Sequence, residues 1–387
     1  MSWHSDNSVK SSYIKSNHVQ NLMQYRKLGR TGVKVSAIGL GSNGIGSSNT
    51  KYALKIIHKA LELGVNYIDT ARSYWDTEKK LGIALKGKRD TVFLSSKVEA
   101  MTKDAALREI KESLELLQTD YLDNCHIHGL EKGEDMEKRL GAGGALEALI
   151  EARRKGLIRH IGCTSHRSDV LVEALKRFDF DIILVPMNIV EREPLKELIP
   201  LCVSRGVGVT VMKPLATGLL PANLALKWLI NQPISTAVPG ITTLEEAEED
   251  LMVNHIEDIS LTSEEKQQIE QTTEHLEHLR CQLCAECQPC PQGIPISTLL
   301  GTEVIYDHYR TMGVEAFKQF QWSQERIRNH IGSLKQTLSQ IRSCTDCKIC
   351  EERCPHALPV VSMLQNMLEP EEDILRIFNK LLPYTSP

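Results

Sequence analysis

The sequence predicts an α/β protein, with a (β/α)8 TIM barrel followed by a smaller, mostly α-helical domain. From residue 33 onward, eight short runs rich in β-branched residues alternate with amphipathic helical stretches. They occupy roughly 220 residues, close to the ~250 residues typical of such a barrel. Cysteine usage then changes abruptly, because eight of the 11 cysteines lie after residue 280. This change marks the boundary of the second domain.

The predicted strands justify the barrel one by one. They are VKVSAIGLG (33–41), NYIDT (66–70), VFLSSK (92–97), YLDNCHIH (121–128), RHIGCTS (159–165), DIILVPM (181–187), VGVTVM (207–212) and STAVPG (235–240). Between them, stretches such as 51–64 and 104–118 place apolar residues at helical spacing, and several end at a glycine. The rival fold, an open doubly wound sheet, would carry G-x-G-x-x-G after its first strand. The glycines of GLGSNGIG (39–46) lie in a different frame, so we favour the barrel.

Four segments divide the chain. Residues 1–24 are polar and predict a flexible arm, and residues 25–260 form the barrel. Residues 261–280 predict a connecting helix that begins with a capping-box pair, Thr262 and Glu265. Residues 281–387 hold two cysteine runs separated by about fifty largely helical residues. We therefore expect the last segment to be a separate, mostly helical domain.

Composition excludes several classes of function. The chain is 41% hydrophobic and 25% charged with a net charge of −4, which is ordinary for a soluble globular protein. It lacks a basic patch, so we expect no nucleic-acid partner. Its apolar runs have strand length, so we expect no membrane partner. Because no export signal is visible, we expect a cytoplasmic protein, in which disulfides rarely persist.

Chemically active side chains stand where the predicted strands end. They are Asp69 after the second strand, Tyr74 in the loop behind it, Lys97 at the end of the third strand and His128 at the end of the fourth. In a barrel these positions converge on one mouth. A phenol can protonate a carbonyl oxygen, but its usual pKa near ~10 is too high for this at neutral pH. A nearby ammonium should lower that pKa, a carboxylate would hold the ammonium, and an imidazole would orient the carbonyl.

These residues lie in motifs that resemble the aldo-keto reductase family. LGRTGVKVSAIGLGSNGIG resembles that family's opening hairpin and first strand, and NYIDTARSYWDTEKKLG resembles its Asp-Thr-Ala…Tyr…Glu…Leu-Gly stretch. SSK resembles its lysine strand and TDYLDNCHIH its histidine strand, so the similarity covers about residues 25 to 255. The resemblance implies a small carbonyl or alcohol substrate. It also implies a catalytic tetrad of Asp69, Tyr74, Lys97 and His128, with Tyr74 as general acid.

His126 gives the mouth an alternative interpretation. His126 and His128 lie on one face of the predicted strand, so a metal pair is conceivable. Metal-dependent barrels usually add carboxylates and further histidines at other strand ends, and we find none there. We therefore assign His128 to the tetrad and expect no metal at the mouth.

The resemblance also implies a nicotinamide dinucleotide, NAD(P)H, across the mouth. GCTSH (162–166) matches a family segment only in part, and in LVPMN (184–188) only the asparagine matches. MKPLATGLL (212–220) resembles the loop that lies along the pyrophosphate. The residues assigned to the dinucleotide in this way are Gly41, Thr164, Ser165, Asn188, Lys213, Pro214, Leu215, Gly218, Pro239 and Gly240.

The last barrel loop departs most from the family pattern. NADPH-preferring relatives hold the 2′-phosphate with basic residues there, whereas PGITTLEEAEED (239–250) has no Lys or Arg and is acidic. A 2′-phosphate would lack a bidentate partner and would meet like charge. The glutamates could instead be a solvated helix face. The choice between NADH, NADPH and no dinucleotide stays open, but we expect no strong preference for NADPH.

The two cysteine runs predict iron–sulfur clusters. The first run is Cys281, Cys284, Cys287 and Cys290, and the second is Cys344, Cys347, Cys350 and Cys354; a proline follows each. The second reads C-x2-C-x2-C-x3-C-P, as in bacterial ferredoxins, in which the fourth cysteine ligates the other cluster. This predicts two 4Fe-4S clusters, one on Cys281, Cys284, Cys287 and Cys354 and one on Cys344, Cys347, Cys350 and Cys290. Zinc, disulfides and a single cluster are the alternatives, but closed zinc sites typically use two separated C-x-x-C pairs.

The tail resembles that of aldo-keto reductases with a C-terminal ferredoxin-like domain. The leading hypothesis is an iron–sulfur oxidoreductase that reduces a carbonyl or oxidises an alcohol. Electrons would come through the clusters, from NAD(P)H, or from both, and a one-electron carrier protein would be a partner. One alternative is a conventional NAD(P)H-dependent reductase with structural clusters. The other is a non-enzymatic redox sensor, against which the intact tetrad argues.

Overall fold

The barrel is built from eight parallel strands. The computed structural model describes residues 23–216, 218–277, 280–281, 284–300 and 324–381, so most of the predicted arm lies outside the described residues. The strands are β3 (Leu40–Gly41), β4 (Tyr67–Asp69), β5 (Phe93–Val98), β6 (Leu122–Ile127), β7 (Ile158–Thr164), β8 (Ile182–Pro186), β9 (Gly208–Met212) and β10 (Thr236–Ala237). They pair in chain order from β3 to β10. Parallel bridges from Ile38 to Ala237 and from Gly41 to Gly240 join the first and last strands and close the sheet.

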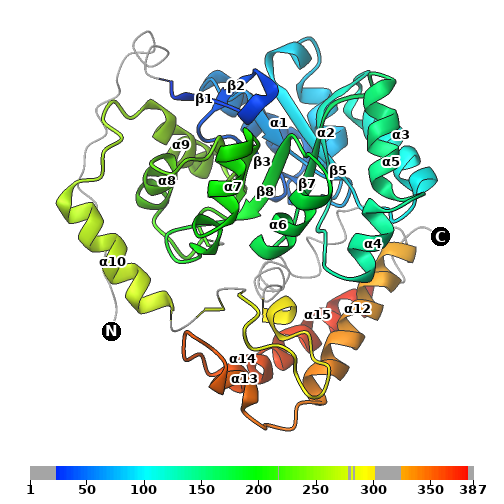
Figure 1. Cartoon of the computed structure of the whole chain (residues 1–387). Helices are drawn as coiled ribbons and strands as arrows, with labels where there is room; N and C mark the ends of the chain where they lie inside the picture. Colours follow the sequence, from blue (N-terminus) through cyan, green and yellow to red (C-terminus); the bar gives the residue numbers. More distant parts are fainter. Residues whose placement is uncertain (1–22, 217, 278–279, 282–283, 301–323, 382–387) are drawn as a thin grey trace.

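Helices cover the outside of this sheet (Figure 1). They are α1 (Thr50–Glu62), α2 (Thr77–Ala84), α3 (Lys103–Leu117), α4 (Glu134–Leu140), α5 (Ala145–Arg154), α6 (Ser168–Arg177), α7 (Leu198–Arg205), α8 (Ala222–Ile230) and α9 (Leu244–Met252). The stretches 51–64 and 104–118, predicted helical from their apolar spacing, correspond to α1 and α3. Helix α1 turns Ala53, Ile56, Ile57 and Ala60 toward the core, as its periodicity predicts.

The prediction of one continuous strand over residues 33–41 was wrong. The first part of this stretch is β2 (Lys34–Ser36), which pairs antiparallel with β1 (Tyr25–Lys27), and only β3 joins the barrel. Between them, the Asn254 side chain accepts a hydrogen bond from the Ile38 N–H at 2.7 Å and donates one to the Ile38 carbonyl at 2.9 Å. A side chain thus satisfies backbone groups that a continuous strand would pair with a neighbour.

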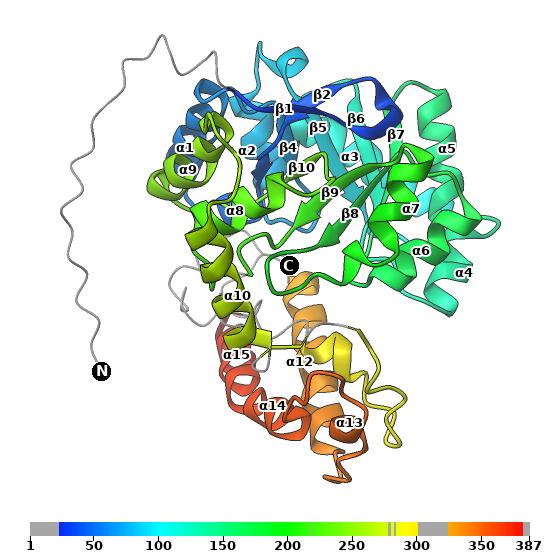
Figure 2. The same ribbon diagram turned by 60° about the vertical axis from the view of Figure 1, so that its left-hand side comes forward.

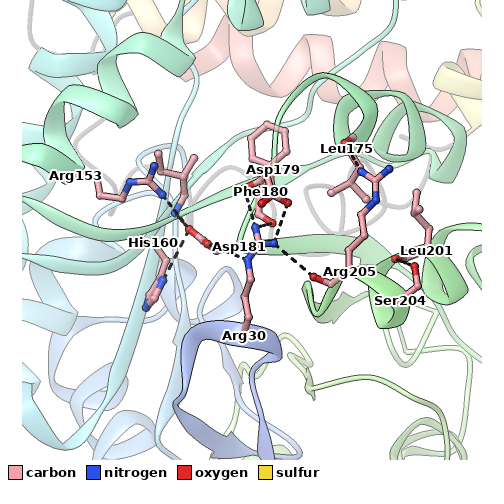
Figure 3. A network of polar contacts seen from close by, with 11 residues as sticks. Arg30, Arg153, His160, Leu175, Asp179, Phe180, Asp181, Leu201, Ser204 and Arg205 are labelled. Atoms are coloured by element: carbon pink, nitrogen blue, oxygen red, sulfur yellow. Dashed lines mark hydrogen bonds and ion pairs between the residues drawn. The ribbon is translucent and has the colours of Figure 1, made fainter.

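The hairpin β1–β2 closes one end of the barrel. Leu28 is fully buried and packs with Val35, Tyr67 and Phe93 in an apolar cluster. Next to it, Arg30 donates hydrogen bonds to the Asp179 carboxylate at 2.8 Å and to the carbonyls of Asp179 and Phe180 at 2.9 Å each. Figure 3 shows Arg30 reaching these groups and Asp181, which precede β8. The hairpin therefore covers the end of the barrel at which the strands begin.

The tail lies at the opposite end. In Figures 1 and 2 the hairpin is at the top of the barrel and the tail lies below the barrel. Helix α10 (Ser263–Glu277) lies between the barrel and the tail in the chain. Helix α10 begins with the predicted capping box, because Thr262 and Glu265 bond each other's backbone N–H at 2.8 and 3.1 Å. The tail contains α12 (Gln324–Arg342), α13 (Ile349–Glu352), α14 (Val360–Asn366) and α15 (Leu368–Leu381). Its described part is mostly helical, as predicted.

The tail has a core of its own. Side chains from the first cysteine run, α12 and α14 form one buried cluster, which includes Ile294, Ile296, Ile341, Val361 and Leu364. Six of the eight tail cysteines belong to this cluster or pack against it. Among the residues described, no helix is both long enough and apolar enough to cross a membrane.

Replacing Arg30 by alanine should destabilise the barrel. The side chain makes three short hydrogen bonds, two of them to carbonyls that would lose this donor. We expect a loss of about 1–2 kcal/mol in the free energy of unfolding, measured by urea denaturation. Lys27→Ala, which removes an exposed cation from the same hairpin, should change it by less than about 0.5 kcal/mol. Equal losses in the two variants would contradict the anchoring role of Arg30.

Candidate active site

Parallel pairing brings the predicted catalytic residues together. Asp69 at the end of β4 pairs in register with Ser95 of β5, and Lys97 of β5 pairs with His126 of β6. His128 follows two residues later, and its N–H donates to the Val98 carbonyl at 2.9 Å. The carboxylate, the ammonium and the imidazole therefore come from three neighbouring strands at the end facing the tail.

Lys97 and Asp69 form a buried ion pair. Lys97 Nζ is 2.7 Å from Asp69 Oδ2 and 2.7 Å from the Thr70 carbonyl, and the two side chains are 1% and 5% exposed. Burial opposes the charge of the lysine, but Asp69 and then Tyr74 outweigh it, so the pKa of Lys97 lies above its usual value. The ammonium is thus kept charged where water cannot reach it.

Tyr74 lies directly over this ammonium. Lys97 Nζ is 4.5 Å from the centre of the Tyr74 ring. Tyr74 lies in a turn, and the next residue, Trp75, has a positive φ of 54°. The expected lowering of the phenol pKa was wrong in its net direction. Burial raises the pKa of Tyr74 above its usual value, and the opposing effect of Lys97 is smaller. The phenol is therefore held in its protonated, proton-donating form at neutral pH.

His128 rather than His126 faces Tyr74. The rings of Tyr74 and His128 meet edge to face with centroids 6.0 Å apart. His128 Nδ1 lies 3.0 Å from the Glu99 carboxylate. His126 is fully buried against Gly162, where an added Cβ would come within 2.2 Å of the His126 Nδ1 atom. This contact explains a glycine at position 162 and supports the choice of His128.

The residues predicted to hold the dinucleotide surround the same mouth. Gly41 ends β3, Thr164 ends β7 and Ser165 follows it, Lys213 to Gly218 follow β9, and Pro239 and Gly240 follow β10. Three buried oxygens nearby, Ser42 Oγ, Asp69 Oδ1 and Thr70 Oγ1, have no hydrogen-bond partner among the described residues. Buried polar atoms are normally satisfied, so these three suit a ligand that carries hydrogen-bonding groups.

Asn188 is used inside the protein. Its amide donates to Glu191 at 2.9 Å and to the Lys213 carbonyl at 3.2 Å, and its oxygen accepts from the N–H groups of Val190 and Glu191. Asn188 therefore fixes the loop after β8 to the loop after β9. Its direct contact with a dinucleotide stays a prediction.

Arg280 ties the start of the cysteine run to these loops. Its Nε lies 3.0 Å from Glu191 Oε1 and its Nη1 donates to the Ala216 carbonyl at 2.8 Å. Glu191 is 6% exposed, so the pair is largely shielded from water. Because Cys281 is the next residue, the first cysteine run starts at the barrel mouth.

Comparisons with known proteins agree with this geometry. The model of the aldo/keto reductase family matches residues 37–223. An uncharacterized oxidoreductase, YqkF of Bacillus subtilis, is 32% identical over 212 residues, which are 51% of this chain and 67% of that protein. The chain belongs to the aldo/keto reductase family. It is accordingly an oxidoreductase of the carbonyl and alcohol type.

Other family members match about two thirds of this chain. L-galactose dehydrogenase of Arabidopsis thaliana is 29% identical over 64% of this chain and 93% of its own. The holo form of aldo-keto reductase AKR11C1 from Bacillus halodurans is 30% identical with a TM-score of 0.57, over 65% of this chain and 96% of its own. A Klebsiella pneumoniae aldo/keto reductase in complex with NADP and acetate is 25% identical with a TM-score of 0.55, over 64% and 94%. The remaining third of this chain lies outside these likenesses.

The last barrel loop of this aldo/keto reductase already contains an anion. Glu246 Oε2 accepts hydrogen bonds from the Thr242 N–H at 2.6 Å, the Thr242 hydroxyl at 2.6 Å and the Thr243 N–H at 3.1 Å. Thr243 in turn accepts from the Glu246 N–H, which completes a capping box at the start of α9. A carboxylate therefore already occupies the N–H groups of Thr242 and Thr243, directly before α9. Glu246 is a cap and not part of a purely solvated face.

The eight tail cysteines line two hollows. One is lined by Cys281, Cys284, Cys287 and Cys354, and the other by Cys290, Cys344, Cys347 and Cys350. Each hollow combines three cysteines of one run with the fourth of the other, which is the grouping predicted from their spacing. Among the described residues, none of the eight forms a disulfide. Within the described part of the chain, no three Cys, His, Asp or Glu side chains are arranged to hold a metal ion, so cluster binding stays a prediction.

Two residues of the mouth escaped the sequence analysis. Glu99 follows β5 by one residue and meets His128, which the strand register could have indicated because Lys97 pairs with His126. His166 lies in the loop after β7, where burial, followed by Lys213 and His128, lowers its pKa to about 3. A neutral imidazole at that position has no signal in the sequence, since its environment comes from other loops.

Proposed function

We propose that this protein reduces a small carbonyl compound, or oxidises the corresponding alcohol, at the barrel mouth. Electrons would reach the mouth from 4Fe-4S clusters in the tail, from NAD(P)H, or from both. The observation that carries the proposal is the buried Lys97–Asp69 pair beneath Tyr74. In addition, the cysteine run that lines the first hollow begins directly after Arg280, which contacts the loops of the same mouth.

The proposed chemistry follows from the charges. In reduction, the Tyr74 hydroxyl donates its proton to the carbonyl oxygen, and the Lys97 ammonium stabilises the phenolate that remains. Asp69 holds the ammonium in place, and His128, whose ring faces Tyr74, would contact the substrate oxygen. A bound nicotinamide would supply the hydride that completes the reduction. In oxidation, the Tyr74 phenolate takes the hydroxyl proton back.

The mouth suits a dinucleotide but not a 2′-phosphate. The unpartnered oxygens of Ser42, Asp69 and Thr70 would be satisfied by hydroxyl or amide groups of a ligand. We assign the same residues to the dinucleotide as the sequence does, from Gly41 to Gly240. At the start of α9, Glu246 already occupies the N–H groups that a 2′-phosphate would need. We therefore propose NAD(H), or weak binding of either dinucleotide.

The tail suits iron–sulfur clusters better than zinc. Four ligands of one zinc ion lie about 2.3 Å from it and so converge closely. A 4Fe-4S cluster holds its four thiolates on four separate irons, so they stay further apart, around a hollow. Apolar residues close the two hollows, Leu358 and Val360 in the first and Ile294, Ile296 and Leu364 in the second. When bound, such clusters would carry electrons singly.

We further propose that residues 25–260 form the barrel, residues 261–280 the connecting helix and residues 281–387 a ferredoxin-like domain. Within that domain, we propose an order of the two clusters relative to the mouth. The hollow of Cys281, Cys284, Cys287 and Cys354 begins next to Arg280 and hence nearer to the mouth. The second hollow includes Cys347, which is exposed. A one-electron carrier protein would therefore meet the second hollow first.

A conventional NAD(P)H-dependent reductase with structural clusters is the second candidate. It is favoured by family members that match the barrel over 93–96% of their own length and so carry no tail of this size. The two candidates differ in whether a one-electron donor supports turnover when no dinucleotide is present.

Replacing Tyr74 by phenylalanine tests the proposed chemistry. Loss of the proton donor should lower kcat/KM for small aldehydes about 10²- to 10⁴-fold, with NADH, NADPH or reduced methyl viologen as donor. Tyr121→Phe is the matched control, because that hydroxyl donates to Asp90 rather than facing the mouth. Unfolding curves and iron content should match the parent in both variants. Equal turnover by Tyr74→Phe and the parent would remove Tyr74 from the mechanism.

Iron and sulfide analysis tests the clusters. Anaerobically prepared protein should contain about eight iron and eight sulfide per chain. Cys354→Ser and Cys290→Ser should each lower the iron content by disturbing one cluster, Cys354→Ser in the first hollow and Cys290→Ser in the second. Cys202→Ser, which changes a buried thiol of α7, should leave the iron content unchanged. Stoichiometric zinc without an EPR signal after dithionite would contradict the proposal. About four iron in the parent would indicate a single cluster.

Fluorescence titration with NADH and NADPH tests the nucleotide preference. We expect NADPH to bind no more than about tenfold better than NADH. Combining Thr242→Arg with Glu246→Gln should improve NADPH binding about tenfold or more, since it adds a cation and removes a negative charge. Glu245→Gln removes a nearby exposed charge but not the cap, so it should have little effect. A hundredfold preference of the parent for NADPH would overturn this prediction.

A further inference from the structure

The carboxylate of Glu99 contacts the imidazole that the proposed reaction uses to fix the substrate oxygen. Glu99 Oε1 lies 3.0 Å from His128 Nδ1. The Glu99 side chain is 48% exposed and that of His128 is 23% exposed. This pair lies at the rim of the mouth, one strand away from the buried Lys97–Asp69 pair.

The surrounding structure holds both partners in place. Glu109 Oε2 accepts hydrogen bonds from the backbone N–H groups of Glu99 at 2.8 Å and Ala100 at 3.0 Å, which fixes the turn that presents the carboxylate. Arg139 donates to the carbonyls of His128 at 2.7 Å and Val98 at 3.0 Å. Arg139 is 3% exposed, so these two bonds clamp the ends of β5 and β6 from within the protein. The 3.0 Å contact is therefore built into the fold.

An ionised carboxylate decides which ring nitrogen carries the hydrogen. A carboxylate only accepts hydrogen bonds, so Nδ1 must carry a hydrogen in order to donate to it. In a neutral imidazole, Nε2 is then the acceptor. In a protonated imidazole, Nε2 also carries a hydrogen and becomes a donor. One contact therefore gives the mouth two distinct hydrogen-bonding states.

We propose that Glu99 is a positioning residue that fixes the hydrogen on His128 Nδ1, so that the charge of His128 selects the ligand held at the mouth. The neutral ring accepts the hydroxyl hydrogen of an alcohol through Nε2. The protonated ring donates from Nε2 to the oxygen of a carbonyl compound. This selection rests on the proposed function, because it assumes that the substrate oxygen lies at His128.

Several charged or titratable groups face this ring. They are Asp69, Tyr74, Lys97, Glu99, His126 and His166. Burial lowers the pKa of His128, and Glu99 works against this effect. Removing the carboxylate should therefore lower that pKa further, so that the protonated ring is lost at a lower pH than in the parent. Alcohol is favoured above the His128 midpoint and carbonyl below it.

The pH dependence of ligand binding tests the proposal without any turnover. The probes are cyclohexanone and cyclohexanol, titrated separately and followed through the His128 ring signal by NMR, which His128→Asn identifies by its loss. In the parent, the ketone should bind better as pH falls through the His128 midpoint and the alcohol worse. In Glu99→Gln both the midpoint and the crossover should fall by about half a unit to one unit. Glu99→Asp keeps a carboxylate, so its midpoint and crossover should fall less than those of Glu99→Gln.

The matched control is Asp104→Asn, which neutralises an exposed carboxylate at the start of α3 without touching His128. It should leave the midpoint and the crossover where they are in the parent. The proposal is overturned if Glu99→Gln moves the midpoint while the crossover stays, or if neither probe disturbs the ring signal. Failure of the proposed function would instead appear as an inactive parent enzyme in which the His128 signal still responds to the probes.

Discussion

The buried ion pair between Lys97 and Asp69 is the interaction on which the rest of this mouth depends. Two charges that are 1% and 5% exposed can persist only because they neutralise each other at 2.7 Å. Their pairing requires β4 and β5 to be parallel neighbours in one fixed register. That register places the lysine beneath Tyr74 and brings His128 in from the next strand. The same pair thus joins the two strand ends and, in the proposed reaction, would supply the charge for proton transfer.

The two ends of the barrel are used differently. Arg30 and Leu28 seal the end where the strands begin, so stability is concentrated there. The end where the strands finish carries Tyr74, the unpartnered oxygens and the loops that bind Arg280. Because Arg280 immediately precedes Cys281, the tail is attached to the loops that the family resemblance assigns to the dinucleotide.

Two carboxylates of this chain occupy positions at the mouth where we propose that a ligand binds. Glu246 caps the start of α9, where we propose that a 2′-phosphate would otherwise bind, and Glu99 contacts His128, the ring proposed to meet the substrate oxygen. The first reduces the gain from binding a phosphorylated dinucleotide. The second adds a proton-dependent hydrogen bond to a site whose phenol is kept protonated by burial.

Local pattern alone determined the order of strands and helices and the residue types at the strand ends, because periodicity and spacing are properties of neighbouring residues. The grouping of cysteines from the two runs was predicted from the ferredoxin pattern and not from local spacing alone. Tertiary structure decided whatever depends on segments far apart in the chain. Asn254 interrupts the first predicted strand from over 200 residues away, and Glu99 meets His128 only through the pairing of β5 with β6. The direction of the Tyr74 pKa shift also needed the fold. A sequence shows that Lys97 can approach the phenol, but burial, which outweighs the lysine, exists only once the barrel has closed.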